Sequence, residues 1–521
     1  MFIVLDWIIV GIYCVGIISI GIYVSRKKSG LERTAEDYFL AGRSLPWWAI
    51  GASLIAANIS AEQIIGMSGQ GFVIGMAIAV WELTAAIALI IVAKFFLPLF
   101  LAKKIYTMPQ FLENRFDKRV SLVLSFFWLI VYIFVNLTAV LWLGTIAINT
   151  LTGLSLEYGM ILLAFLSLAY SLSGGLKAVA MTDIIQVILL IFGGLTVSYI
   201  ALTKIGDGSI SSGLFEVYHL VPEKFDMILS ADNPSYNNLP GIWILIGAGV
   251  WIGHLAYWGF NQYITQRALA AKSIIEAQKG IIFAAYLKIL MPIVIVFPGI
   301  CASILFPILD KTDQAYPRMM IELLPNGLLG LTFAALIAAI ISSLASMSNS
   351  ISTIFTMDIC RSFSKNEISQ SSLITIGKSA VVGSMLIAMT MAKPILGNSD
   401  QVFQYIQNFT GLFTPGILLI FLVALFWKKA TTLSVLVAAV LSVVMSIMIQ
   451  TFFAEFPYIH RMGIVFLISG IGCYLTSLSQ GYLDQENAID LNKINFKTNI
   501  TFNFNSLIII GIIFLVYLFF G

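Results

Sequence analysis

Polar residues interrupt an apolar segment near position 60, and their types suit the binding of a cation or a polar solute. Asn58, Ser60, Glu62 and Gln63 follow one another closely, and a glycine stands at position 66. A helix broken here would free backbone carbonyls for a hard cation, while Gln63 could hydrogen-bond a polar solute. The alternative is that small and polar residues pack helices together. We favour binding, because Glu62 and Gln63 exceed what packing requires.

Two charged residues lie far apart in the sequence, each inside an apolar stretch. They are Glu82 and Lys288. A charged side chain at the centre of a membrane helix costs roughly 2.5–3.5 kcal/mol, so such residues normally face a cavity or a partner. One aqueous cavity lined by both would accommodate both charges. The alternative is that each pairs with some other group and only fixes helix packing.

An aromatic pair could hold a sugar ring. His254 and Tyr257 are three residues apart, so on a helix they would share a face. Aromatic rings bind sugars by stacking on the C–H face of the ring. A histidine that only packs is an equally good interpretation.

Neutral hydroxyls gather in a later apolar stretch. Ser342 and Ser343 offer oxygen ligands without net charge, which suits a monovalent ion that must be released again. Small residues for close packing are the alternative. Asp183, at the start of another apolar stretch, could be a way-station for a cation or a carboxylate near a helix N-terminus.

The elements that position these residues are membrane helices. The chain has 521 residues, of which 59% are hydrophobic and only 11% charged, whereas soluble domains have about 25% charged residues. A span needs about 20 apolar residues. We predict about fourteen spans, beginning near Leu5, Leu45, Gly75, Val120, Tyr158, Ala178, Gly241, Gly280, Leu328, Leu373, Phe403, Thr431, Met462 and Thr501.

Charge predicts the orientation. Alternate loops hold most of the lysines and arginines, among them Arg26, Lys104, Arg267 and Lys365. Positive loops face the cytoplasm, so we predict both termini on the outer or periplasmic side of the plasma (inner) membrane. The net charge of +3 gives no reason to expect nucleic acid as a partner. The three histidines are scattered and a GxxxxGK[ST] loop is absent, so we expect no enzyme, and any pumping would draw on an ion gradient.

Five segments carry motifs of a known kind, namely residues 36–43 (EDYFLAGR), 170–178 (YSLSGGLKA), 52–69, 259–283 and 338–358. These segments resemble the sodium/solute symporter family, and most closely its bacterial galactose-transporting members. The resemblance covers nearly the whole chain. It implies an all-α integral membrane protein with two inverted five-helix repeats, each beginning with a discontinuous helix. One transporter domain, residues 1–521, would comprise a peripheral first helix (5–24), repeat one (45–204), repeat two (241–427) and peripheral C-terminal helices (431–521).

The resemblance also implies roles for particular residues. Sodium would bind the carbonyls of Ala56, Ile59 and Ala339 and the hydroxyls of Ser342 and Ser343. The sugar would contact Gln63, Glu82, Lys288 and Gln407, with His254 beside them. Tyr257, held by Asn58, would be the inner gate and would stack on the sugar. Met67, Trp81 and Phe403 would form the outer gate, and Asp183 would lie on the sodium exit path.

Three departures bear on which sugar is bound. Ala85 stands where those relatives have a serine, His254 where they have an asparagine, and Trp81 where they have a gate tyrosine. A buried polar group left without a partner costs about 1–3 kcal/mol, so galactose itself is left open. We expect a symporter that imports a small monosaccharide with sodium by alternating access, with no cofactor beyond the coupling ion. The alternatives are a sodium symporter for an inositol, a sialic acid or an amino acid, and a non-transporting solute sensor. The sequence leaves the oligomeric state and the number of sodium ions open.

Overall fold

The computed structural model describes residues 2–24, 35–103, 105–364, 367–399 and 401–521. This part of the chain is almost entirely helical and contains no strand; one isolated bridge joins Leu45 to Ala271. Several residues used in the sequence argument lie outside the description, namely Arg26, Lys104 and Lys365. So do the side chains of motif residues 38, 170, 173–175 and 178.

Long apolar helices dominate the molecule. Nine helices of the described chain are long and apolar enough to cross a membrane, or up to eleven if each bent pair counts as one span. The nine are Met76–Lys103, Lys118–Thr152, Val179–Ile205, Ile274–Leu305, Leu328–Phe363, Gln370–Leu396, Thr432–Phe452, Tyr458–Ser479 and Ile500–Phe520. A helix lies near every predicted start, but the count of fourteen stays a prediction.

The helices that matter for the site can be named by their bounds. They are α1 (Val4–Val24), α3 (Trp47–Asn58), η2 (Glu62–Met67), α4 (Ser68–Ile74), α5 (Val80–Ile91), η5 (Tyr132–Leu137), α10 (Leu156–Ile205), α13 (Ala248–Phe260), α14 (Gln262–Leu269), α15 (Ile274–Met291), α18 (Leu328–Ile354), α21 (Val402–Thr410), α22 (Thr414–Phe426) and α24 (Tyr458–Ser479). The remaining long helices are α8 (Lys118–Val131), α9 (Thr138–Thr152), α20 (Gln370–Leu396), α23 (Thr432–Phe452) and α25 (Ile500–Phe520).

Two helices are broken where the sequence predicted discontinuity. The α3 segment ends at Asn58, and the helix that resumes at Glu62 and runs to Ile74 is bent by 60° from it. The α13 and α14 segments are separated by Asn261, whose φ of −74° and ψ of 122° are extended rather than helical. A further bend, of 46°, separates α21 from α22. The repeat boundaries at 45–204 and 241–427 stay predictions.

The predicted fifth and sixth spans are joined in the structure. Both fall within α10, whose 50 residues have helical backbone throughout, including the junction where we expected a loop. The hydrophobic part of α10 divides into Leu156–Ala169 and Val179–Ile205.

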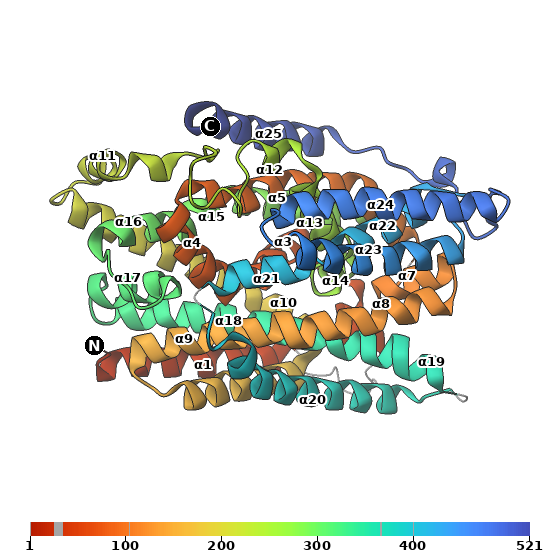
Figure 1. Ribbon diagram of the computed structural model, residues 1–521. Coiled ribbons are helices and arrows are strands. Elements are labelled where there is room, and N and C mark those ends of the chain that lie inside the picture. Colours follow the sequence, from red (N-terminus) through yellow and green to blue (C-terminus); the bar gives the residue numbers. More distant parts are fainter. Residues whose placement is uncertain (1, 25–34, 104, 365–366, 400) are drawn as a thin grey trace.

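The ends of the molecule agree with an even number of crossings. Figure 1 shows the N-terminus and the C-terminus at the same end of the bundle, together with α11 (Ile210–Leu220) and α17 (Ala315–Leu323). The opposite end carries α7 (Met108–Arg115) and α19 (Arg361–Phe363).

Close backbone contact brings the first half of the broken helix against α15. A Cβ built on Gly51 would lie 2.6 Å from the carbonyl oxygen of Gly280, and one on Gly280 would lie 2.8 Å from the carbonyl oxygen of Trp47. Small residues at such crossings let helix backbones approach within a membrane. This crossing sets α15, which carries Lys288, beside the binding segment.

Candidate binding site

The predicted binding and gate residues converge on one cavity. It encloses about 1000 Å³ including its opening to solvent. Helices from both predicted repeats line it, together with Tyr458 and Met462 of α24. Its lining includes Gln63, Glu82, His254, Tyr257, Lys288 and Gln407 as well as Asn58, Met67, Trp81 and Phe403. The structure therefore brings together every residue that we assigned to the solute and to the two gates.

Glu82 and Lys288 form a buried ion pair in this lining. Lys288 Nζ lies 2.6 Å from Glu82 Oε2, and the side chains are only 1% and 2% exposed. The ammonium also faces the ring of Trp258 at 5.3 Å, a cation–π contact. The sequence left two alternatives, one cavity shared by both charges or a separate partner for each. The structure shows the shared cavity. Oxygens of a solute could exchange hydrogen bonds with both members of the pair.

His254 is fixed beside the pair by a hydrogen bond to Thr84. The Thr84 hydroxyl donates to Val80 O at 2.5 Å, and His254 Nε2 lies 2.8 Å from the same oxygen. Because a threonine hydroxyl has one hydrogen, Nε2 is the donor to Thr84. The Trp81 ring packs edge-on against the imidazole, with the ring centroids 5.4 Å apart. Ala85 also lines this part of the cavity.

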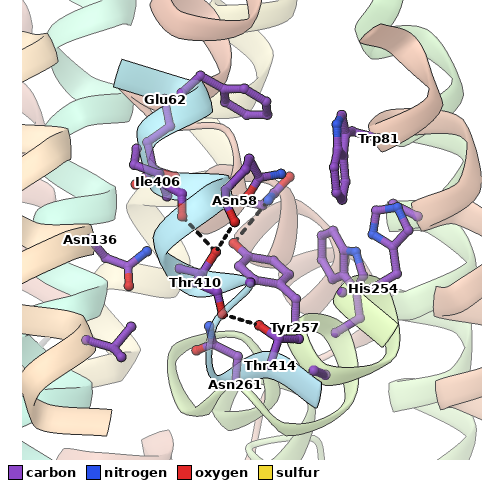
Figure 2. Close-up of a pocket in the computed structure, with 18 of the residues that line it drawn as sticks. Asn58, Glu62, Trp81, Asn136, His254, Tyr257, Asn261, Ile406, Thr410 and Thr414 are labelled. Carbon is purple, nitrogen blue, oxygen red and sulfur yellow. Dashed lines mark hydrogen bonds between the residues drawn. The ribbon is translucent and has the colours of Figure 1, made fainter. Parts of the chain in front are cut away.

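Hydroxyl contacts hold Tyr257 across the cavity. Asn58 Nδ2 donates to its hydroxyl at 3.0 Å, and the hydroxyl of Tyr263 lies 2.6 Å away. In Figure 2 the Tyr257 ring lies between Asn58 and the second helix break at Asn261. Both broken helices are thus joined through one phenol, which suits the predicted gate role.

The second break is itself stabilised by side chains. Tyr132 donates to Asn261 Oδ1 at 2.6 Å and accepts from the backbone N–H of Gln262 at 2.9 Å. This satisfies a backbone donor that the extended Asn261 leaves at the start of α14. We had assigned no role to Tyr132 or Asn261. The available signal was a polar residue within an apolar segment for Tyr132, and for Asn261 its place at the start of the polar run 261–267.

Three large side chains of the cavity lining come from η2, α5 and α21. Met67, Trp81 and Phe403 are 1%, 8% and 4% exposed. Phe403 packs directly on the broken helix, since a Cβ on Gly66 would lie 2.9 Å from the Phe403 Cβ. These contacts suit the predicted outer gate.

The break near residue 59 leaves carbonyls outside the regular helical ladder. In an unbroken helix Ser60 N would bond to Ala56 O, but it bonds instead to Asn58 O at 2.9 Å. The Ser343 hydroxyl approaches Ala56 O and Ala57 O, each at 3.4 Å. Carbonyls and a hydroxyl thus converge from α3 and α18, as oxygen ligands of a small cation must. The chemistry of these donors fits sodium; the assignment of Ala56, Ile59, Ala339, Ser342 and Ser343 stays a proposal.

Ser342 points to a second cluster centred on Asp183. Its hydroxyl donates to one carboxylate oxygen of Asp183, and that of Ser53 donates to the other. Arg267 Nη2 lies 3.5 Å from the same carboxylate, and the guanidinium also donates to the Ser346 hydroxyl. Asp183 and Arg267 are 0% and 1% exposed. The cluster joins α3, α10, α14 and α18 beside the predicted sodium ligands.

Arg267 corrects the sequence analysis. We placed it in a cytoplasmic loop, and this was wrong: it lies inside α14, fully buried. The segment reads as a loop because its mean hydropathy is low, but its polar side chains face other helices rather than water. Arg461 is likewise a buried arginine within a helix, 4% exposed in α24.

Comparisons with known proteins agree with this architecture. The family model of the sodium:solute symporter family matches residues 38–442. The chain is 47% identical over 519 residues to the sodium/glucose cotransporter of Vibrio parahaemolyticus, covering 96% of this chain and 95% of that protein. It is 32% identical over 456 residues to human sodium/myo-inositol cotransporter 2, covering 81% of this chain and 66% of that one.

Solved structures show the same fold. A sodium-coupled sialic acid symporter in a substrate-bound outward-open state superposes with a TM-score of 0.81 at 23% identity, covering 92% of this chain and 98% of that one. Mhp1, a nucleobase-cation-symport-1 family transporter, superposes with a TM-score of 0.55 at 14% identity, over 91% of this chain and 99% of that one. With its family match over most of its length and a relative at nearly half identity, the chain belongs to the sodium:solute symporter family.

Proposed function

We propose that this protein imports a small neutral sugar together with sodium by alternating access. The observation that carries the proposal is the cavity itself, where the Glu82–Lys288 pair meets the Tyr257 ring and several amide side chains beside a broken helix. Hydroxyls of a monosaccharide are both donors and acceptors, so a carboxylate, an ammonium and amides can satisfy them together. An aromatic face supplies the apolar contact.

Sodium would act through the first broken helix. Bound between the carbonyls near Ala56 and the hydroxyl of Ser343, the ion would hold α3 and α18 together and so order Asn58 and Gln63 for the solute. Asp183 would bind the ion on its way to the cytoplasm. Its contact with Arg267 would then be replaced by a contact with the ion.

The sodium gradient and the membrane potential together are large enough to drive accumulation of a sugar. Each sodium ion contributes about 2.3 kcal/mol per 100 mV of membrane potential. A tenfold sodium gradient adds about 1.4 kcal/mol. One sodium per sugar therefore supports roughly several-hundred-fold accumulation. In this proposal the protein resides in the plasma (inner) membrane with both termini outside, carries out no catalysis and needs no cofactor.

A second candidate solute is a cyclic polyol. The observation that favours it is the set of sodium/myo-inositol cotransporters among the relatives, at 32% identity. A ring of hydroxyls without a ring oxygen would meet the same donors and acceptors.

Uptake by proteoliposomes tests the proposal. Purified protein should accumulate labelled galactose or glucose when sodium is outside and potassium inside, and replacement of sodium by choline should abolish accumulation. Unlabelled myo-inositol, mannitol and alanine added as competitors separate a sugar carrier from a polyol or amino acid carrier. Uptake of every probe at the rate of protein-free liposomes, or uptake indifferent to sodium, would refute the proposal.

A further inference from the structure

One carboxylate of the cavity has no cationic partner in the part of the chain that the structure describes. Glu62, the first residue of η2, lines the cavity and is 8% exposed. Among the described residues, no lysine, arginine or histidine nitrogen lies within 4.0 Å of its oxygens. Its Oε1 is buried and has no hydrogen-bond partner among the described residues. The neutral Asn136 side chain, from η5, lines the same cavity.

The corner around Glu62 is rich in unused acceptors. Asn58 Oδ1 is also buried and without a partner, because the amide uses its nitrogen on Tyr257. Asn58 and Asn136 are each 5% exposed and line the same cavity. In Figure 2 Glu62 and Asn136 lie to the left of Asn58, and Trp81 and His254 lie to its right. Buried acceptors without donors are costly, so this corner is built to receive a donor.

The charge of the described lining is unbalanced in the same direction. Its carboxylates are Glu62 and Glu82, whereas its only lysine, Lys288, is already paired with Glu82 at 2.6 Å. The Glu62 side of the cavity therefore has no positive charge of its own among the described lining residues, and a cation or a strong donor on the solute would supply one.

We propose that Glu62, with Asn136 and Asn58, selects the charge of the solute: the cavity admits neutral and protonated amino sugars and rejects acidic sugars. A ring ammonium facing Oε1 forms a charge-assisted hydrogen bond, stronger than that of a hydroxyl. A sugar carboxylate in the same place would lose its hydration and find no unpaired lysine or arginine among the described lining residues. Glu62 is thus a specificity-determining residue of the proposed transport function, on which this inference rests.

Ligand binding to the purified protein provides the test. The probes are glucose, its 2-amino, 3-amino and 6-amino deoxy analogues, and glucuronate, each measured by thermal stabilisation of the protein in detergent with sodium present. The analogue whose amino group faces Glu62 should bind at least about tenfold more tightly than glucose, a difference of about 1.4 kcal/mol. Glucuronate should bind at least about tenfold more weakly.

Glu62→Gln keeps the shape of the side chain but removes the carboxylate. In this variant the affinities for the amino analogue and for glucuronate should each lie within about threefold of the affinity for glucose, while glucose itself still binds. Glu322→Gln is the matched control, because it removes an exposed carboxylate on α17 that is paired with Arg318. It should leave both affinity ratios to glucose unchanged.

The outcomes separate this inference from the proposed function. Ratios in Glu62→Gln equal to those of the wild type overturn the inference even if uptake requires sodium. So does a variant in which only the cooperativity of sodium binding falls, since the carboxylate would then hold an ion and not the solute. Altered ratios without sodium-dependent uptake support the selectivity of the cavity and overturn symport. Binding of none of the five probes to the wild type overturns both.

Discussion

The buried ion pair of the cavity gives a quantitative prediction. At 2.6 Å and an effective dielectric constant of about 20, the gross attraction between Glu82 and Lys288 is about 6 kcal/mol before desolvation is subtracted. Removing one partner leaves a buried charge unpaired, which typically costs about 3–5 kcal/mol. Glu82→Gln and Lys288→Met should each lower the free energy of unfolding by that amount, and the double variant should recover most of the loss.

The assay is a double-mutant cycle on unfolding in mixed micelles with increasing sodium dodecyl sulfate. The exposed pair Arg318–Glu322, 2.9 Å apart and 48% and 37% exposed, accepts the same substitutions as a control. Its coupling energy should stay below about 1 kcal/mol. Effects of the buried pair that add within about 0.5 kcal/mol would refute the reasoning.

Transport should respond differently from stability in the same variants. The double variant regains its fold but offers the solute neither the carboxylate nor the ammonium. We expect kcat/KM for sugar uptake to remain lower by on the order of a hundredfold, which corresponds to about 3 kcal/mol of lost contacts. Recovery of uptake together with stability would mean that the pair serves packing alone.

Three further predictions concern the ion, the gate and the helix crossing. Ser343→Ala should raise the sodium concentration needed for half-maximal uptake more than it changes sugar selectivity, and Gln63→Ala should do the reverse; sodium titrations and competitor panels on both variants measure this. Tyr257→Phe removes two hydroxyl contacts worth about 0.5–1.5 kcal/mol each, so uptake should fall by roughly tenfold, and an unchanged rate would argue against the gate. Gly51→Ala places a methyl group 2.6 Å from Gly280 O, so the free energy of unfolding should fall by about 1–3 kcal/mol, and stability equal to wild type would contradict the close crossing.

Residue type and hydropathy were sufficient to predict the membrane class and the first helix break. The reason is energetic: polar residues such as Glu62, Glu82 and Lys288 are too costly in lipid to stand there without a cavity or partner. The resemblance supplied the roles, and the structure places all the predicted solute and gate residues around one cavity.

Long-range pairing was beyond the sequence alone. Arg267 could be recognised as buried only once α14 was packed against α18, because a short polar helix and a cytoplasmic loop have the same composition. Ser342 offers a hydroxyl to any neighbour, and only the packing of α10 against α18 turns it toward Asp183. In the same way, whether a buried carboxylate has a countercharge is a property of three-dimensional neighbours: Glu82 has one from α15, and Glu62 has none among the described residues. The sequence determined which residues must avoid lipid, and the tertiary structure decided which of them meet, since meeting depends on helix crossings set by contacts far apart in the chain.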